Sequence, residues 1–408
     1  MLVAAPTGSG KSAVAELAIL RMLNQASEGE CIAKAVYVAP MPSLIEDKFE
    51  SWSEKFGKLG LNVECLTGEP LSDVKILDKA NIALATPEAW EALSRRWRQR
   101  KAVQKVALFI IDELHLVGGK IGPAIEVGTS RVRYMSSQMP KAIRIVALSA
   151  SLANARDIGD WIGATSQKIF NFPPSARPVP VEIHINGFDI SSQEARMQAM
   201  ARPAYRSIGL HAPEKESSVV FVPTRKHAKK TALDMLTFAA SEGQPDKFMI
   251  ASQEDVEPFL EEIKDSALKH SLSYGVGFIH ESQTKQEQKI VRTLFASGAI
   301  QVLVATASCA WSLNCTAKLV IIMGTQYYDS IGQASNDYSM PDLLQMVGRA
   351  GRPGVDSKAV YVCLMMSEKL RFPHRVNFFF HTYSLFHFFQ VYSHVSYSQE
   401  RVLQKILV

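Results

Sequence analysis

Short apolar runs alternate with helix-period segments along most of this chain. Helical periodicity appears at 13–26, 47–60 and 87–101. The apolar runs between them are uninterrupted and rich in β-branched residues: KAVYVAP (34–40), NIALATP (81–87), VALFIIDE (106–113) and IRIVALSA (143–150). Runs of this kind are typical of strands that are buried on both faces of a parallel sheet. The alternation therefore predicts an α/β domain that is built by right-handed crossovers.

The pattern stops at a cluster of four prolines between residues 173 and 180 and then resumes. The later apolar runs are SSVVFVPT (217–224), YGVGFIH (274–280), AIQVLVAT (299–306), KLVIIMG (318–324) and KAVYVCLM (358–365). A length of 408 residues suits two domains of about 200 residues each. We predict a first α/β domain over 1–172, a proline-rich linker over 173–200 and a second α/β domain over 201–367.

Residues 368–408 break the pattern and are rich in Phe, His and Tyr. We expect an atypical tail that is truncated or mispredicted. The alternative is a genuine aromatic segment that binds a membrane or a partner, because so many phenylalanines would otherwise form an exposed apolar patch.

Composition sets broad limits on function. Hydrophobic residues make up 47% and charged residues 21%, as in globular proteins, and the net charge of +5 is compatible with an anionic partner. No run of about 18 apolar residues is present, so we expect no membrane-spanning helix. The five cysteines show no C-x-x-C pair, which indicates reduced thiols and a cytosolic or nuclear location.

A glycine-rich turn followed by Lys and Ser opens the chain. Counted from Ala5, the pattern A-x-x-G-x-G-K-S fits the phosphate-loop class G-x-x-x-x-G-K-[ST], with Ala in place of the first glycine. Glycines let backbone amides surround phosphate oxygens, and the following helix adds its positive end. Lys11 would reach the β and γ phosphates of ATP, and the Ser12 hydroxyl would bind Mg²⁺. The predicted nucleotide contacts are Thr7, Gly8, Ser9, Gly10, Lys11 and Ser12.

Two carboxylates follow the apolar run LFII (108–111). Acids at the carboxyl end of a parallel strand face the crevice where such sheets bind ligands. Asp112 could hold Mg²⁺ through water, and Glu113 could orient or deprotonate the water that attacks the γ-phosphate. A bare Asp-Glu pair is often only a solvated strand end, but an upstream phosphate loop makes the catalytic interpretation far stronger.

A third segment, QMVGRAGRPG (345–354), carries Arg349 and Arg352 three positions apart. Their planar, permanently charged guanidinium groups suit the stabilisation of charge on a transferring phosphoryl group. Taken alone, R-x-x-R is usually a solvated surface. Here it follows the loop and the acids in the order that a two-lobed ATPase requires.

Together these segments resemble the superfamily-two helicases. The DELH box (112–115), LSAS (148–151) and QMVGRAGR (345–352) are similar to the DExH-box branch that carries a Sec63-type extension. Longer stretches resemble the spliceosomal U-five snRNP branch, in particular its second cassette, and the activating signal cointegrator branch is the next most similar. These stretches are 94–104, 115–127, 130–138, 144–163, 170–188 and 321–329.

The resemblance implies two RecA-like parallel-sheet domains in tandem with the ATP site in the cleft between them. It implies an ATP-dependent RNA helicase of pre-mRNA splicing, with ATP and Mg²⁺ as cofactors, RNA and spliceosomal proteins as partners, a nuclear location and no membrane contact. The implied catalytic residues are Asp112, Glu113, Gln345, Arg349 and Arg352. Ser149 and Ser151 would couple the γ-phosphate state to domain closure. The implied nucleic-acid contacts are Pro40, Thr86, Pro87, Glu88, Thr224, Arg225 and Thr306.

This sequence also departs from the family pattern. The upstream segment that would contact adenine is absent from it, and Ser312 stands where the family usually has glycine. The winged-helix, ratchet and Sec63-like parts are absent after about residue 368. These departures favour an alternative function, a largely non-catalytic nucleotide-binding cassette that docks and regulates spliceosomal partners. The intact loop, acids and arginines favour the enzyme.

Overall fold

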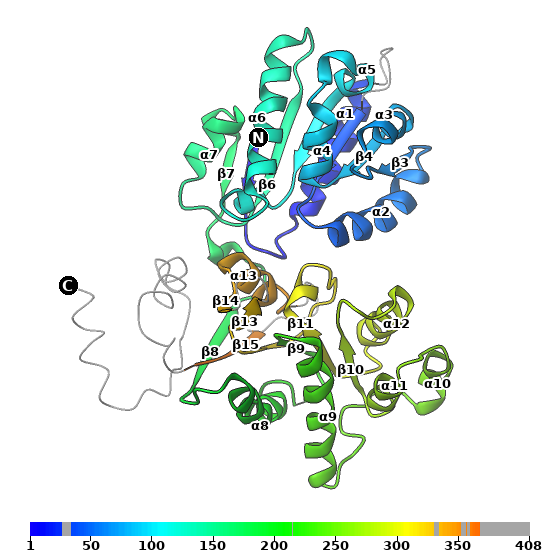
Figure 1. The fold of residues 1–408 in the computed structure, drawn as a ribbon, viewed down its shortest axis with the longest axis vertical. Coiled ribbons are helices and arrows are strands. Elements are labelled where there is room, and N and C mark those ends of the chain that lie inside the picture. Colours follow the sequence, from blue (N-terminus) through cyan, green and yellow to red (C-terminus); the bar gives the residue numbers. More distant parts are fainter. Residues whose placement is uncertain (27–33, 214, 330–333, 352–355, 357–359, 368–408) are drawn as a thin grey trace, which may run out of the picture. The chain divides into compact units, whose positions relative to one another are not determined.

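The computed structural model describes residues 1–408 apart from 27–33, 214, 330–333, 352–355, 357–359 and 368–408. The chain forms two compact units, Met1–Pro178 (unit 1) and Val179–Val408 (unit 2), and Figure 1 shows a sheet with flanking helices in each. The predicted tail and Arg352 lie outside the described residues.

Unit 1 is built on a parallel sheet of seven strands in the order β3-β4-β2-β5-β6-β1-β7. The strands are β1 (Leu2–Ala4), β2 (Lys34–Val38), β3 (Val63–Cys65), β4 (Ile82–Ala85), β5 (Val106–Ile111), β6 (Arg144–Ser149) and β7 (Ile169–Asn171). The helices are α1 (Lys11–Ala26), α2 (Pro42–Gly57), α3 (Pro70–Lys79), α4 (Pro87–Ser94), α5 (Lys101–Gln104), α6 (Gly122–Gln138) and α7 (Ala155–Ile162).

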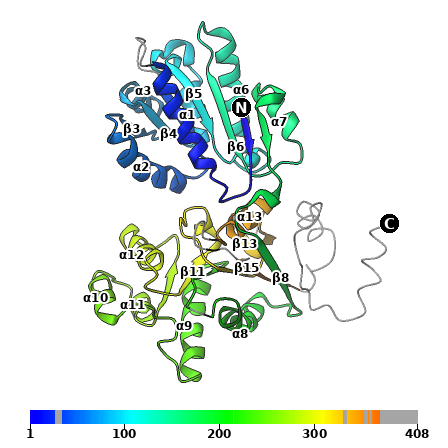
Figure 2. The same cartoon turned by 180° about the vertical axis from the view of Figure 1, so that it is seen from behind.

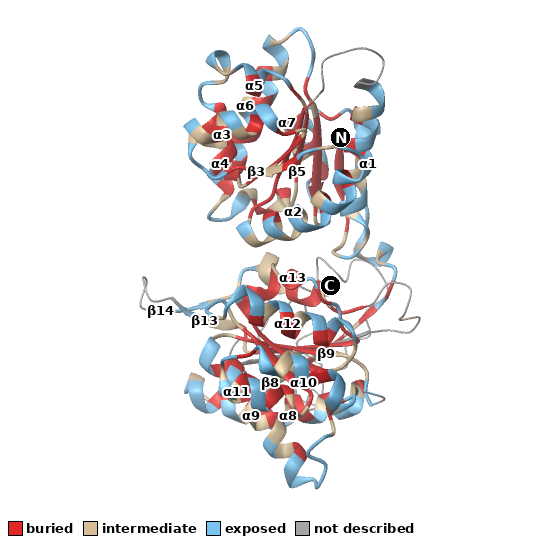
Figure 3. Cartoon of the chain, turned by 90° about the vertical axis from the view of Figure 1, so that its right-hand side faces the viewer, coloured by how far each residue is buried: buried red, intermediate tan, exposed pale blue. Residues whose placement is uncertain are grey.

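Helices cover both faces of this sheet, which explains why its strands read as unbroken apolar runs. Successive side chains of a strand point to opposite faces. In β5, Leu108 and Ile110 pack with α1 and α2, whereas the ring of Phe109 lies 5.2 Å from that of Trp90 on α4. Figures 1 and 2 show α4 and α6 on one side of the sheet and α1 on the other. Both sets of strand side chains are therefore buried, as Figure 3 also shows.

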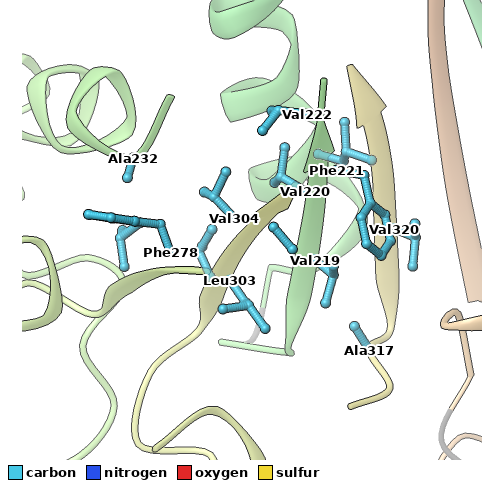
Figure 4. Packing of buried hydrophobic residues seen from close by; sticks show 14 of the residues in the cluster. Val219, Val220, Phe221, Val222, Ala232, Phe278, Leu303, Val304, Ala317 and Val320 are labelled. Atoms are coloured by element: carbon cyan, nitrogen blue, oxygen red, sulfur yellow. The ribbon is translucent and has the colours of Figure 1, made fainter. Parts of the chain in front are cut away.

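Unit 2 has a six-stranded sheet, also parallel, in the order β10-β11-β9-β12-β15-β8. Its strands are β8 (Val181–Phe188), β9 (Ser218–Val222), β10 (Val276–Ile279), β11 (Val302–Thr306), β12 (Leu319–Met323) and β15 (Val360–Ser367), and β13 (Gln326–Asp329) pairs antiparallel with β14 (Ala334–Asp337). The helices are α8 (Gln193–His211), α9 (Arg225–Ser241), α10 (Gln253–Glu261), α11 (Ser266–Leu272), α12 (Lys285–Ala296) and α13 (Met340–Gly348). Figure 4 shows valines of β9 packed against β11 and β12 in the centre of this core.

The structure confirms the predicted class, α/β with two parallel sheets, and corrects the predicted linker. Segment 173–200 contains β8 and the start of α8, and β8 pairs with β15 over its whole length. Val181, Ile183 and Ile185 are buried while the residues between them are half-buried, so β8 is an edge strand with one apolar face. Prolines are tolerated beside such a strand because its outer edge carries no ladder.

The predicted helix over 87–101 is divided in the structure into α4, a 3₁₀ turn (Trp97–Gln99) and α5.

Gly122, the first residue of α6, brings this helix against the 3₁₀ turn Leu114–Gly118 that follows β5. A Cβ atom at Gly122 would lie 1.9 Å from the carbonyl oxygen of Val117, which is a backbone atom and cannot rotate away. We expect Gly122→Ala to lower the free energy of unfolding by about 1–3 kcal/mol, as overpacking does. Urea unfolding followed by tryptophan fluorescence measures this, because four of the five tryptophans lie in unit 1.

The control for this prediction is Gly57→Ala. A Cβ atom at Gly57, the last residue of α2, meets no atom within 4 Å. Alanine is the better helix former, so this variant should be as stable as the wild type or slightly more stable. Equal unfolding midpoints for the two variants would show that α6 has room to move away from Val117.

Candidate functional site

Strand register brings most of the unit 1 candidates to one edge of the sheet. Ala4 of β1 is paired with Ser149 of β6, Ile111 of β5 with Ala147 of β6, and Val38 of β2 with both Ile111 and Ala85. The carboxyl ends of β1, β2, β4, β5 and β6 therefore lie level. The segments that leave them are 5–12, 39–41, 86–88, 112–115 and 150–152. They contain every unit 1 residue that the sequence analysis selected except Ser149, which is the last residue of β6 itself.

The loop between β1 and α1 has the backbone of a phosphate loop. Gly8 and Gly10 have φ of 84° and 89°, a left-handed conformation that other residues rarely adopt. A Cβ atom at either position would meet nothing within 4 Å, so backbone conformation rather than space requires glycine here. The loop ends at Lys11, where the 16-residue α1 begins and presents its positive end to the loop. Lys11 Nζ donates hydrogen bonds to the carbonyl oxygens of Ala5 (2.9 Å) and Pro6 (3.2 Å).

Asp112 points to the α1 and α2 side of the sheet, as its spacing from Leu108 and Ile110 requires. Its Oδ2 accepts a hydrogen bond from the Tyr37 hydroxyl, and its Oδ1 accepts one from the backbone N–H of Glu113 (2.9 Å). Burial and the neighbouring Asp112 carboxylate raise the pKa of Tyr37 well above its usual range, so the phenol stays a donor. A carboxylate has about four acceptor positions, which leaves Asp112 capacity for a cation.

A lysine of α2 reaches the same place. Lys48 Nζ donates to Ser12 Oγ at 2.8 Å, and its ammonium lies 5.6 Å from the centre of the Trp52 ring. Burial lowers the pKa of Lys48 below its ordinary value, while the negative charge of Asp112 acts in the opposite direction. Ser12 and Asp112, the two predicted metal ligands, thus already share a cationic neighbour.

Glu113 has a left-handed backbone, with φ of 52° and ψ of 43°. For a residue other than glycine this conformation costs on the order of 1–2 kcal/mol, and such strain gathers at functional sites. Its side chain is 12% exposed, and Glu113 Oε2 lies 3.5 Å from His115 Nδ1. Because the chain turns at Glu113, the side chains of Glu113 and His115 both lie at the end of β5.

His115 joins the acidic segment to the segment after β6. The backbone N–H of Ala150 donates to His115 Nδ1 at 3.2 Å, so this nitrogen carries no proton. Burial, with the nearby Lys11 charge, lowers the pKa of His115 from 6.5 to about 4. A neutral imidazole therefore fixes the Ser149–Ser151 segment relative to Glu113.

The His115 pKa predicts a pH dependence of stability. Between pH 6.5 and about 4, His115 is protonated in the unfolded chain but stays neutral in the folded chain. His115 therefore lowers the free energy of unfolding progressively as the pH falls through this range. The total loss is at most about 3 kcal/mol. We expect His115→Asn, whose amide oxygen can accept the Ala150 N–H, to match the wild type at pH 8 and to be more stable at pH 4.5. Urea unfolding at the two pH values tests this, and an equal loss in both proteins would contradict it.

The Ser149–Ser151 segment is also tied to the end of β7. Ser151 Oγ donates to the carbonyl oxygen of Phe172 at 2.8 Å, and the Asn171 side chain makes two hydrogen bonds with the backbone of Leu152. Ser149 differs, because its buried Oγ has no hydrogen-bond partner among the described residues. These contacts link the β6 end to the part of the chain that leads into unit 2.

The candidate nucleic-acid contacts of unit 1 follow β2 and β4. Pro40 is buried just after β2. The Thr86 side chain caps α4 by accepting from the Ala89 N–H at 3.3 Å, Pro87 is the first residue of that helix, and Glu88 is exposed in its first turn.

In unit 2, Thr224, Arg225 and Thr306 also lie at one edge of a sheet, because Val222 of β9 pairs with Thr306 of β11. Thr224 caps α9, and Arg225 Nη1 donates to Ser282 Oγ at 3.3 Å. Thr306 Oγ1 and Ser308 Oγ donate to Glu281 Oε2 at 2.9 and 2.8 Å. Burial raises the pKa of Glu281, but its backbone and hydroxyl hydrogen bonds outweigh burial and keep the pKa below the usual value.

The remaining candidates of unit 2 lie on and after α13. Gln345 is buried on this helix. Arg349 is half-buried, and its guanidinium donates to the carbonyl oxygens of Ala310 (2.8 Å) and Trp311 (3.4 Å) in the segment after β11. Ser312 of that segment donates to the Cys309 carbonyl at 3.2 Å and lies 3.4 Å from Arg292 Nη2.

Comparison with known proteins matches the DEAD/DEAH box helicase family over residues 1–158 and the helicase conserved C-terminal domain over residues 228–354. The chain belongs to the DEAD/DEAH-box helicases. Membership of this family implies ATP binding, and the first match contains the loop, the acids and the Ser149–Ser151 segment. The second match contains Thr306, Gln345, Arg349 and Arg352.

Several curated helicases are similar to this one over about nine tenths of its length. DExH-box ATP-dependent RNA helicase DExH12 of Arabidopsis thaliana is 52% identical over 367 residues, which are 89% of this chain and 17% of that protein. The human U5 small nuclear ribonucleoprotein 200 kDa helicase is 49% identical over 373 residues, 91% of this chain and 17% of that protein. Activating signal cointegrator 1 complex subunit 3-like of Dictyostelium discoideum is 44% identical, over 89% of this chain and 16% of that protein. The chain thus spans about a sixth of the length of these relatives.

Three residues at this helicase's unit 1 edge were not selected from the sequence: Tyr37, Lys48 and His115. His115 belongs to the DELH box and could have been chosen, whereas Tyr37 lies inside an apolar strand and Lys48 inside an ordinary amphipathic helix. Within the described part of the chain, no cluster of three or more His, Cys, Asp or Glu could hold a metal by itself, and no helix is long and apolar enough to cross a membrane.

Proposed function

We propose that this chain is the ATP-hydrolysing cassette of an RNA helicase that acts in pre-mRNA splicing. One observation carries the proposal: β-sheet register places the Gly8–Ser12 loop, the Asp112-Glu113 pair and the Ser149–Ser151 segment at a single edge of unit 1. Loop amides and Lys11 would bind the phosphates of ATP, and Glu113 would orient the attacking water. Ser149 and Ser151 would couple the γ-phosphate state to domain closure.

The donor set at this edge suits Mg²⁺. The Ser12 hydroxyl and the Asp112 carboxylate are hard oxygen ligands, and one or two such ligands together with phosphate oxygens are the usual protein site for this ion. The Ser12 hydroxyl oxygen already accepts a hydrogen bond from the Lys48 ammonium. When bound with ATP, Mg²⁺ would neutralise charge on the β and γ phosphates. Gln345, Arg349 and Arg352 stay candidates for the contribution of unit 2 to this reaction.

RNA is the proposed substrate because the similar proteins are named RNA helicases and U5 ribonucleoprotein helicases. The contacts would be Pro40, Thr86, Pro87 and Glu88 in unit 1 and Thr224, Arg225 and Thr306 in unit 2. Contacts of this kind go to phosphate and sugar, so binding should show little sequence preference and fall with salt. A splicing role places the protein in the nucleus with spliceosomal protein partners.

Phosphate release from ATP by the 408-residue chain, with and without single-stranded RNA at low and moderate salt, tests this function. We expect RNA to stimulate release at low salt and to lose much of that effect at moderate salt. ATP binding without any RNA stimulation would instead support the non-catalytic docking cassette. Arg349 supports the docking alternative, because its guanidinium is hydrogen-bonded to the carbonyl oxygens of Ala310 and Trp311.

A further inference from the structure

Lys48 is a half-buried lysine in the middle of α2 whose ammonium lies at the phosphate-loop edge. Its Nζ is 2.8 Å from Ser12 Oγ, and the hydrogen bond joins residues 36 positions apart in the chain. The Trp52 ring, one turn further along α2, is fully buried and lies beneath the ammonium. The Trp52 indole N–H in turn donates to Glu16 Oε1 of α1 at 3.0 Å, so this ring is fixed between the two helices.

Burial lowers the pKa of Lys48 below its ordinary value, and neighbouring carboxylates oppose part of that shift. Burial works against the charge, but the carboxylates of Asp112, Glu16 and Asp47 work for it, and Asp112 has the largest effect of the three. Ser12 Oγ is the acceptor of the Lys48 hydrogen bond. An oxygen lone pair that accepts from an ammonium is the same kind of lone pair that a hard metal ion uses.

We propose that Lys48 is a resident cation of the nucleotide site: it holds the Ser12 hydroxyl when no metal is bound, it attracts the phosphates of metal-free ATP, and Mg²⁺ must displace it from Ser12. The proposal rests on ATP binding at the Gly8–Ser12 loop, as proposed above. It assigns Lys48 a positioning role in phosphate binding that neither the loop motif nor the acidic pair contains.

The proposal has two opposite consequences for affinity. Without metal, the Lys48 charge offsets the repulsion between ATP phosphates and Asp112, so ATP binds better than the loop alone allows. With metal, Lys48 repels Mg²⁺ and competes for Ser12, so the gain in affinity from Mg²⁺ is reduced. Two unit charges 4 Å apart interact by about 4 kcal/mol near a protein surface, which is ample for a tenfold effect in either direction.

Lys55 provides a matched control on the same helix. It lies seven residues after Lys48, on the same face of α2, and its Nζ is 3.0 Å from Glu16 Oε1. The structure records no contact of Lys55 with Ser12 or Asp112. A neutral residue at position 55 changes the net charge of α2 as much as one at position 48, but removes no hydrogen bond to Ser12.

The test measures the dissociation constant of ATP by calorimetry in EDTA and in excess Mg²⁺, using the full 408-residue chain. The proteins are the wild type, Lys48→Met, Lys48→Arg and Lys55→Met. Methionine keeps an unbranched stem to pack on Trp52 and removes the charge. We expect the ratio of the two constants (EDTA over Mg²⁺) to rise about tenfold in Lys48→Met and to stay at the wild-type value in Lys55→Met.

Lys48→Arg separates charge from packing, since it retains a cation and should keep the wild-type ratio. A ratio for Lys48→Met equal to that of Lys55→Met would overturn the role of Lys48 while leaving the proposed function standing. Failure of the wild type to bind ATP in either buffer would instead reject the proposed function, and the Lys48 role with it. If Lys48→Met does not fold, a changed ratio in Lys48→Arg decides against the proposal, because the charge would then not be the property that matters.

Discussion

Replacing Lys11 by alanine will lower the affinity of the chain for ATP by about a hundredfold and leave the fold intact. Lys11 contacts the loop carbonyls, and we propose that its ammonium binds the β and γ phosphates of ATP. Hydrogen bonds to charged groups contribute about 1.5–3 kcal/mol each, and 1.4 kcal/mol corresponds to a factor of ten. Lys11 Nζ donates to the carbonyl oxygens of Ala5 and Pro6, so its removal costs two hydrogen bonds of a half-buried loop.

Calorimetric titration with Mg-ATP measures this effect, and circular dichroism checks the fold. The control is Lys101→Ala. Lys101 is exposed at the start of α5, immediately before β5, and therefore belongs to the opposite edge of the sheet from the loop. Equal ATP affinity of the two variants would show that the triphosphate does not bind at the Gly8–Ser12 loop.

The site residues that could be predicted are those whose chemistry is local. Asp112 follows a short, β-branched apolar run that is typical of a buried strand, so both its presence at a strand end and its orientation follow from the period of two along β5. The loop of Gly8–Ser12 is identified by spacing alone, since the left-handed conformations of Gly8 and Gly10 require glycine at those positions.

The contacts that could not be predicted join residues far apart in the chain. Lys48 and Ser12 are 36 positions apart, and the His115 and Ala150 pair is 35 positions apart, so no local pattern indicates either hydrogen bond. Each contact exists because the carboxyl ends of the parallel strands lie at one edge of the sheet. The connecting helices pack on its two faces. The pairing order of the strands therefore decides these contacts, and strand order was not part of the prediction.

The prediction of a linker over 173–200 failed at β8 for a different reason. Its sequence VEIHINGF alternates apolar and polar residues, whereas the strands predicted from the sequence are unbroken apolar runs. The strand follows Pro178 and Pro180, which indicated a linker, and among the described residues it pairs with β15 alone, about 180 residues later in the sequence. An edge strand with one buried face resembles an extended linker until its partner is known.

Glu113→Gln will stop ATP turnover while ATP still binds. Glutamine keeps the size of the side chain and its position after Asp112, but it is neutral and cannot accept a proton from the attacking water. A positioned general base contributes about a hundredfold to ten-thousandfold in rate, so phosphate release should fall by a factor in this range. The dissociation constant of Mg-ATP should change only a few-fold, because the Gly8–Ser12 loop, Lys11 and Asp112 are unaltered.

The strained backbone of Glu113 sharpens this prediction. With φ of 52°, the residue holds its 12% exposed carboxylate in a conformation that a solvated strand end would not maintain, beside a His115 imidazole whose low pKa keeps it neutral. A neutral His115 cannot form an ion pair with Glu113, so the carboxylate keeps its capacity to act as a base. Single-turnover phosphate release at saturating ATP isolates the chemical step, and Glu126→Gln, an exposed position on α6, is the control. Release by Glu113→Gln at the rate of that control would mean that another group activates the water, and that the strain at Glu113 serves the turn into His115 rather than catalysis.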